Sequence, residues 1–121
     1  PLLAVIIATL TSCTAQSFNK NIEAENMKQL MEQGVTIIDV RTPQEYSEGY
    51  IKGAVNIDWY ASDFQNNIEQ LNHQNPVVLY CRSGNRSGLA AVKLQSMGFI
   101  KIYSLTGGMN SWQVSGFPVE N

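Results

Sequence analysis

The chain has 121 residues, enough for one domain, which argues against a two-domain enzyme with an interdomain cleft. Hydrophobic residues make up 44% of the sequence and charged residues 15%, a balance typical of a globular protein with a core. The net charge of -2 argues against a general nucleic-acid-binding protein, which needs a basic face. Two cysteines are too few for a disulfide framework, and with one histidine they are too few for a four-ligand zinc site.

The N-terminal segment differs in character from the rest of the chain. Residues 1–12 carry no charge, and residues 2–10 form an apolar run. This run is shorter than the roughly 20 residues of a membrane-spanning helix, but it has the length of the apolar region of a signal peptide. The residues that follow it resemble the lipobox of bacterial lipoproteins, in which the chain is cut before a cysteine that carries a lipid: Leu10, Thr11, Ser12 and Cys13.

The lipobox resemblance implies a signal segment over residues 1–12, lipidation of Cys13 and a tether over residues 13–21. The protein would then lie in the cell envelope, periplasmic or membrane-anchored, with membrane contact only through that lipid. The alternative is a buried N-terminal β-strand, because Val5, Ile6 and Ile7 have good strand propensity. In that case the protein would be cytoplasmic.

From residue 22 onwards, segments typical of helices and of strands alternate. The spacing of Ile22, Met27, Leu30 and Met31 predicts a first helix that ends before Gly34. Further helices are expected over residues 43–48, 63–71 and 87–97 and after Gly107 and Gly108, and strands over residues 36–40, 54–57, 76–80 and 102–105. In helix 87–97, Leu89, Val92 and Leu94, together with Ala90 and Ala91, are expected to pack. This alternation predicts an α/β domain with a parallel sheet covered by helices on both faces.

The residues after strand 76–80 form the candidate site, because ligands of such folds bind at the carboxyl ends of the strands. Cys81 ends this strand, and the small residues after it allow successive backbone N–H groups to converge on one point. The helix N-terminus and the side chains of Arg82 and Arg86 add positive charge. Such surroundings lower a thiol pKa from about 8.5, which favours a nucleophilic thiolate that holds an anion. The alternative is a buried cysteine that acts only as a small hydrophobic residue.

Four segments, in this order along the chain, resemble the signatures of the rhodanese-like sulfurtransferase family. The loop Cys81 to Ser87, C-R-S-G-N-R-S, is similar to the family's active-site loop. The other three are D-V-R from Asp39 to Arg41 with Glu45 and Tyr46, the stretch from Gly49 to Ile57, and L-T-G-G from Leu105 to Gly108 with Trp112. In the second of these, Tyr50 replaces the usual histidine. The resemblance covers residues 22–118 and implies one rhodanese-like domain over residues 22–121.

What the resemblance implies is a five-stranded parallel sheet flanked by helices on both faces, with no metal and no dissociable cofactor. Cys81 would be the nucleophile that takes a sulfane sulfur from a small sulfur-containing anion, such as thiosulfate or polysulfide, and passes it from a persulfide to a thiol or cyanide. The loop residues would hold the persulfide and the anionic donor: Arg82, Ser83, Gly84, Asn85, Arg86 and Ser87. A structural role for Arg86 is nearly as well supported.

The resemblance assigns supporting roles to residues outside the loop. Asp39 and Arg41, with Glu45, are expected to hold the end of their strand under the loop. Gly107 and Gly108 with Trp112 are expected to form turn and core rather than to take part in chemistry.

Two other functions fit a cysteine in such a loop. A cysteine phosphatase uses a thiolate under a ring of N–H donors, but its loop has one more residue between the cysteine and the arginine than Cys81 and Arg86 have. The stronger alternative is a persulfide-binding or redox-sensing module without turnover, which delivers sulfur to a protein partner or reports oxidation of Cys81.

Overall fold

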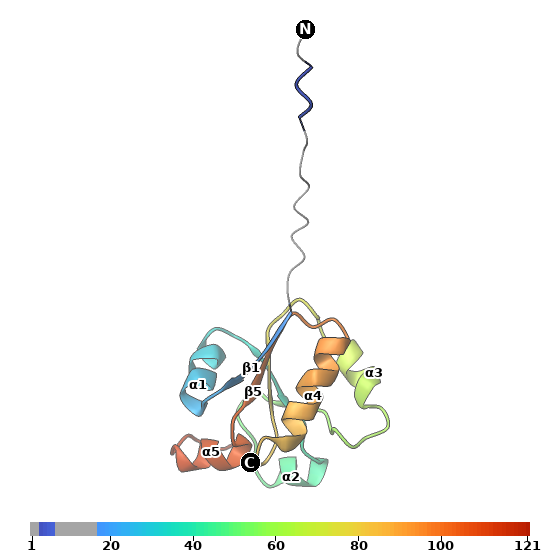
Figure 1. Ribbon diagram of the computed structural model, residues 1–121. Coiled ribbons are helices and arrows are strands. Elements are labelled where there is room, and N and C mark those ends of the chain that lie inside the picture. The colour runs from blue at the N-terminus through green and yellow to red at the C-terminus, as the bar shows by residue number, and fades with distance from the viewer. Residues whose placement is uncertain (1–2, 7–16) are drawn as a thin grey trace.

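The computed structural model of the chain describes residues 3–6 and 17–121 (Figure 1). Its core is a five-stranded sheet with the strand order β1-β5-β4-β2-β3, in which all pairs are parallel. The strands are β1 (Phe18–Ile22), β2 (Thr36–Asp39), β3 (Val55–Asn56), β4 (Val77–Tyr80) and β5 (Lys101–Leu105). The helices are α1 (Ala24–Glu32), α2 (Pro43–Ser47), α3 (Phe64–Glu69), α4 (Asn85–Ser96) and α5 (Gly108–Val114). The expected α/β fold with a five-stranded parallel sheet is confirmed.

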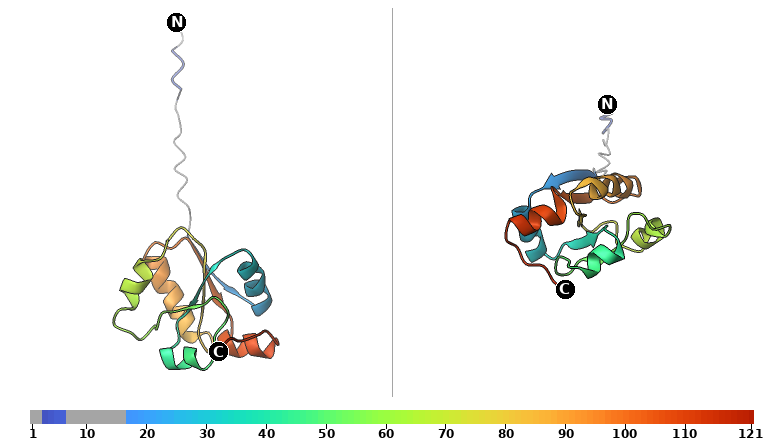
Figure 2. Two further views of the ribbon diagram at one scale, coloured as in Figure 1. Left: turned by 180° about the vertical axis from the view of Figure 1, so that it is seen from behind. Right: turned by 90° about the horizontal axis from the view of Figure 1, so that it is seen from below.

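Helices cover both faces of the sheet, and this is clearest at the central strand β4. All of its residues are buried. Val77 and Leu79 belong to the cluster that packs under α3 and α4, whereas Val78 and Tyr80 belong to the cluster under α1 and α5. The two helix pairs lie on opposite sides of the strands in both views of Figure 2. Burial on both faces explains why this strand is a continuous apolar run in the sequence.

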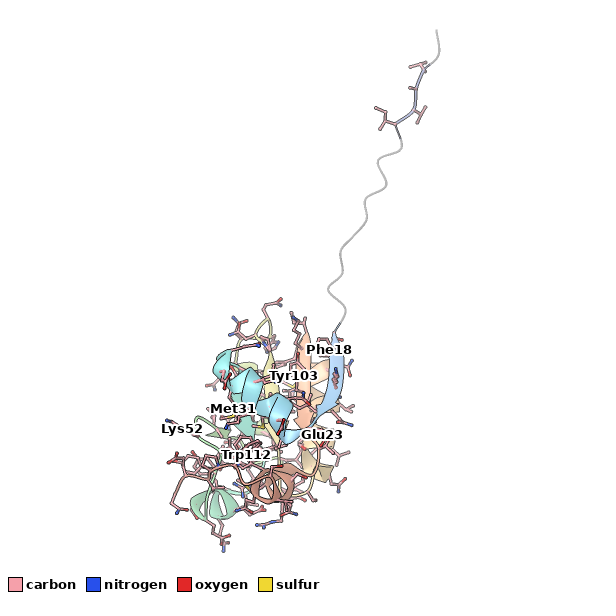
Figure 3. All side chains as sticks on the ribbon, turned by 90° about the vertical axis from the view of Figure 1, so that its left-hand side faces the viewer. Phe18, Glu23, Met31, Lys52, Tyr103 and Trp112 are labelled. Carbon is pink, nitrogen blue, oxygen red and sulfur yellow. The ribbon has the colours of Figure 1, made fainter. Side chains whose placement is uncertain are left out.

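Strand β1 changes the predicted boundary between tether and domain. Residues 18–21, expected in the tether, pair with the edge of β5, from Phe18 opposite Lys101 to Ile22 opposite Leu105. The Phe18 ring also meets the Tyr103 ring edge-on, with 5.4 Å between the centroids, and Figure 3 labels both residues. The domain therefore includes Phe18, and the prediction that it starts at residue 22 is wrong.

The N-terminal segment is described only in part. Residues 3–6 form neither helix nor strand, and the side chains of Leu3, Val5 and Ile6 are exposed. In these residues there is thus no sign of the buried strand considered as an alternative. Ile7 and Cys13 lie outside the described residues. No helix in the described part of the chain is long and apolar enough to cross a membrane.

Helix α4 packs against the sheet by only part of the expected set of residues. Ala90, Ala91 and Leu94 are buried, but Leu89 and Val92 are exposed. The buried positions recur at helical spacing from Ser87, and Leu89 and Val92 lie outside this buried stripe. The alanines let the helix approach the sheet closely, directly after the loop that holds Cys81.

Candidate active site

The loop after β4 lies at the carboxyl end of the central strand of the sheet. Residues 81–84 connect Tyr80, where β4 ends, to Asn85, where α4 begins. Because β2 and β5 flank β4, the ends of three parallel strands meet here. In Figure 1, α2 and the start of α4 lie together at this lower end of the domain. The loop is therefore where the topology predicts a ligand site.

Cys81 lies at the bottom of this loop, where its side chain is only 1% exposed. The backbone N–H of Gly84 donates to Cys81 Sγ at 3.1 Å, and the thiol lies 3.6 Å from the hydroxyl of Ser87. Burial by itself raises the pKa of the Cys81 thiol. Hydrogen bonds from the backbone and hydroxyl of Ser87, and from the backbone N–H groups of Gly84 and Ser83, outweigh it and leave the pKa below its ordinary value. The expected thiolate-stabilising loop is present.

The curvature of the loop depends on Gly84, which has a φ of +104° and caps the N-terminus of α4. Only glycine adopts this backbone conformation without strain. The turn directs N–H groups of the loop and of the first turn of α4 toward Cys81 Sγ. A sulfur that carries negative charge is stabilised by such a group of donors.

The N-terminus of α5 holds the backbone of the Cys81 loop by hydrogen bonds. The N–H of Met109 donates to the carbonyl of Cys81 at 2.8 Å, and the N–H of Asn110 donates to the carbonyl of Arg82 at 3.0 Å. This approach requires Gly108, because a Cβ there would collide with the Cys81 carbonyl oxygen and lie 2.8 Å from the Arg82 carbonyl carbon. Gly108, which was expected to serve only as part of a turn, therefore also positions the Cys81 loop.

One carboxylate, that of Glu45 on α2, binds both arginines of the loop. Arg86 donates to it from both terminal nitrogens, at 2.6 and 2.9 Å, whereas Arg82 donates only from Nε, at 3.2 Å. Arg86 holds the pKa of Glu45 down at about 2 despite partial burial, and Glu45 in turn raises the pKa of Arg86. The Tyr60 ring lies 5.7 Å from the Arg86 guanidinium.

This arrangement bears on two expectations. Arg86 was expected to assist an anionic donor or to have a structural role, and since both of its terminal nitrogens donate to Glu45, the contacts favour the structural role. Glu45 was expected to help Asp39 and Arg41 hold the end of their strand under the loop. Instead its carboxylate connects α2 to the Cys81 loop, and of the two loop arginines only Arg82, whose side chain is 51% exposed, has terminal nitrogens without a hydrogen bond to the described residues.

Helix α2 is folded so that Glu45 points toward the loop. Thr42 caps the helix: its hydroxyl accepts a hydrogen bond from the N–H of Glu45, and the Glu45 carboxylate accepts one from the N–H of Thr42. Pro43 occupies the first helical position, as predicted. The same carboxylate therefore caps its own helix and binds the arginines.

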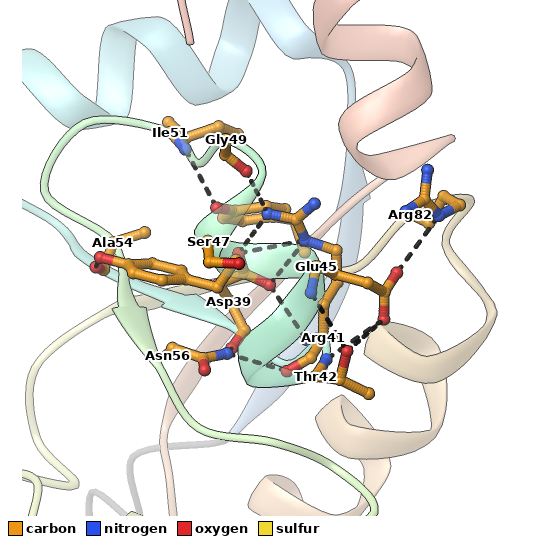
Figure 4. A network of polar contacts seen from close by, with 12 residues as sticks. Asp39, Arg41, Thr42, Glu45, Ser47, Gly49, Ile51, Ala54, Asn56 and Arg82 are labelled. Atoms are coloured by element: carbon orange, nitrogen blue, oxygen red, sulfur yellow. Dashed lines mark hydrogen bonds and ion pairs between the residues drawn. The ribbon is translucent and has the colours of Figure 1, made fainter. Parts of the chain in front are cut away.

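Asp39 and Arg41 form a buried ion pair at the end of β2 (Figure 4). Arg41 donates to the Asp39 carboxylate at 2.7 Å and, from the same nitrogen, to the carbonyl of Gly49 at 2.7 Å. The amide of Asn56 on β3 donates to the backbone carbonyls of both charged residues. The pair thus joins β2, β3 and the segment after α2, a supporting role beneath the helix that carries Glu45.

Tyr50, which replaces the histidine of the family pattern, packs against residues outside the Cys81 loop. Its ring stacks on Tyr46 with 4.3 Å between the centroids, and its backbone pairs with Glu120 near the C-terminus. The neighbouring Ile51 donates its N–H to the hydroxyl of the buried Tyr80. This replacement therefore affects packing beside α2 and not the loop of Cys81.

Of the loop residues named from the sequence, Ser83, Gly84 and Ser87 direct backbone N–H groups at the sulfur, and Ser87 adds its hydroxyl. Ser83 and Asn85 have exposed side chains, and Cys13 lies outside the described residues. The sequence did not reveal the contact of Glu45 with the arginines or the hold of α5 on the loop. The family signatures contain these residues, but their spacing along the chain gives no indication of which side chains meet.

The model of the rhodanese-like domain matches residues 16–115 of the chain, a range that spans the α/β domain from β1 to α5 and includes the Cys81 loop. The protein belongs to the rhodanese-like family. It is 39% identical over 102 residues to a thiosulfate sulfurtransferase GlpE of Pseudomonas fluorescens, a match that covers 84% of this chain and 90% of the relative. Similarity at this level supports a rhodanese-type sulfurtransferase.

Solved structures show the same fold. A rhodanese-related protein from Thermoplasma volcanium is 30% identical, with a TM-score of 0.72, and the match covers 84% of this chain and 97% of that one. A rhodanese-like domain protein from Staphylococcus aureus is 28% identical, with a TM-score of 0.71 and coverage of 84% and 99%. The resemblance seen in the sequence motifs thus extends over the whole domain.

Proposed function

We propose that this protein is a sulfurtransferase that carries a sulfane sulfur as a persulfide on Cys81. The observation that carries the proposal is the lowered pKa of a thiol at the end of β4, held by backbone N–H donors at the start of α4. The curated relative of Pseudomonas fluorescens is a thiosulfate sulfurtransferase by name, which supports thiosulfate as a donor. No step requires a metal or an organic cofactor.

The first half-reaction loads the cysteine. The Cys81 thiolate attacks the outer sulfur of thiosulfate, a new S–S bond forms, and the old S–S bond breaks so that sulfite leaves with the electron pair. The N–H groups of Gly84 and of the first turn of α4 would stabilise the charge on the sulfur atoms. The exposed guanidinium of Arg82 is the group available to hold the donor's anionic oxygens.

The second half-reaction removes the outer sulfur from the Cys81 persulfide. A thiolate or cyanide attacks the outer sulfur of the persulfide, and Cys81 leaves as a thiolate. The products are a new persulfide or thiocyanate, and the enzyme returns to its starting state. Because the two half-reactions are separate, ping-pong kinetics are expected.

The decisive experiment measures thiocyanate formation from thiosulfate and cyanide in a Cys13→Ser background, with Cys81→Ser added as the matched blank. We expect turnover that depends on Cys81, and a Cys81 peptide that gains about 32 Da with donor and loses it with reductant. Equal turnover with and without Cys81 would contradict the mechanism. Loading without turnover would instead favour the persulfide carrier or redox-sensing module.

The contacts of Arg86 count against the phosphatase alternative. A cysteine phosphatase needs its loop arginine to hold a phosphate, whereas both terminal nitrogens of Arg86 bind Glu45. We therefore expect no hydrolysis of a phosphate monoester such as p-nitrophenyl phosphate, measured with the same protein samples.

We also propose a place in the cell envelope, through a lipid on Cys13. The uncharged apolar segment and the lipobox-like residues before Cys13 support this proposal, as does the exposure of Leu3, Val5 and Ile6. Since β1 and β4 lie in one parallel sheet, β1 begins at the end opposite the Cys81 loop, so an anchor before Phe18 would leave the loop open. Metabolic labelling with a fatty acid should mark the wild-type protein and not Cys13→Ser, and a soluble, unlabelled wild-type protein would refute the anchor.

A further inference from the structure

The side chains of Arg82, Arg86 and Glu45 surround the opening of the Cys81 loop, which we call the mouth. The carboxylate of Glu45 is not shared equally between the two arginines. Glu45 binds Arg86 through two short hydrogen bonds and Arg82 through a single longer one. The Arg86 side chain is 15% exposed, against 51% for Arg82. One guanidinium is therefore neutralised and enclosed, and one remains open to solvent.

The formal charges of these three side chains add up to a single positive charge. Arg82 and Arg86 contribute two positive charges and Glu45 removes one. When Cys81 is a thiolate, its negative charge balances that remaining cation. A dianion that approaches the sulfur then meets one open guanidinium, which can match only one of its two charges.

We infer that Glu45 is a specificity-determining residue, which sets the charge preference of the site toward sulfur donors with a single negative charge, such as hydropersulfides, over dianions such as thiosulfate. This inference rests on the proposed function and adds the donor's charge to it. Glu45 acts through the arginines, and in the described residues its carboxylate forms no hydrogen bond with the sulfur of Cys81 or with the loop backbone. It is thus a positioning residue.

The test compares two donors of similar shape and different charge, thiosulfate and methanethiosulfonate, in which a methyl group replaces one charged oxygen. Glu45→Gln removes the charge but keeps an acceptor for the helix cap, since glutamine also serves at this position of a capping box. Coulomb's law for one unit charge several ångströms away predicts that kcat/KM for thiosulfate, relative to methanethiosulfonate, rises about three- to tenfold.

Two further variants separate local charge from net charge and from misfolding. Glu69→Gln makes the same change in net charge on α3, where Glu69 is exposed and contacts Gln65, and it should leave the ratio within about twofold. Arg86→Met removes a cation and should shift the ratio in the opposite direction. Thermal unfolding confirms that each variant is folded.

A second readout does not depend on sulfur transfer. Iodoacetate is an anion and iodoacetamide is neutral, so the ratio of the rates at which they alkylate Cys81 reports the charge of the mouth. Mass spectrometry of the Cys81 peptide measures both rates. The ratio should rise in Glu45→Gln and fall in Arg86→Met. If wild-type protein turns over neither donor, the proposed function fails, and the alkylation ratio still decides this inference. Unchanged ratios in Glu45→Gln, or equal changes in Glu69→Gln, would overturn it.

Discussion

Replacement of Gly108 by alanine should distort the Cys81 loop without changing a residue of the loop itself. Gly108 has a φ of +54°, which costs a residue with a Cβ about 1 kcal/mol. The added Cβ would also collide with the carbonyl of Cys81, and forced overpacking of this kind costs about 1–3 kcal/mol. The free energy of unfolding should therefore fall by about 2–4 kcal/mol in total.

Gly116 provides the matched control for this substitution. Its φ is +79°, and a Cβ there would meet nothing within 4 Å, so Gly116→Ala carries the backbone cost alone, about 1 kcal/mol. Urea unfolding of the two variants measures the difference between them. Gly108→Ala should also lose sulfur transfer and show a raised Cys81 pKa, because the loop must shift. Equal stability of the two variants with an unchanged thiol pKa would falsify the idea that α5 holds the loop.

Four further predictions concern charge and hydrogen bonding at the site. Ser87→Ala removes a hydroxyl near the sulfur, so the pKa of Cys81 should rise toward its ordinary value, measured as the pH dependence of alkylation; an unchanged pH profile would exclude this contribution. Asp39→Asn leaves the buried partner guanidinium without its counter-charge and should lower the free energy of unfolding by about 3–5 kcal/mol in urea titrations, and a loss under 1 kcal/mol would count against the buried pair. Glu45 has a pKa of about 2 in the folded protein, below the ordinary 4.5, so its contribution to stability is present above pH 4.5 and lost as the pH falls toward 2; Glu45→Gln should lack this part of the pH dependence of unfolding. Arg82→Ala should raise the KM for thiosulfate more than it lowers kcat, and an unchanged KM would remove Arg82 from the donor site.

Local signals in the sequence predicted most elements because their causes are local. The apolar run of β4 reflects burial on both faces, and Thr42 with Pro43 marks the start of α2 through its cap. Strand β1 was missed for the opposite reason. Its residues are mostly polar and partly exposed, and only the backbone pairing with β5, some eighty residues later in the chain, makes it a strand.

The candidate site likewise contains features that local sequence predicts and features that depend on contacts between distant segments. A cysteine after a buried strand, then small residues and a helix, is a local pattern, and it was enough to predict a lowered thiol pKa at Cys81. The sequence left open whether Arg86 binds a donor or has a structural role, because its partner Glu45 lies 41 residues away on another helix. A charged side chain near an active site can bind a substrate or a neighbour, and its own sequence environment is the same in both cases.

What the sequence by itself determined is the family, the order of most elements and the candidate nucleophile, since these depend on residue types and short-range spacing. Only the tertiary structure decided the electrostatics of the mouth and the contacts that hold the loop. Glu45 neutralises Arg86, and Gly108 lets α5 hydrogen-bond to the loop from behind. Both effects act between segments that are distant along the chain, and the energies of ion pairs and close contacts depend on distances in space that only the folded chain sets.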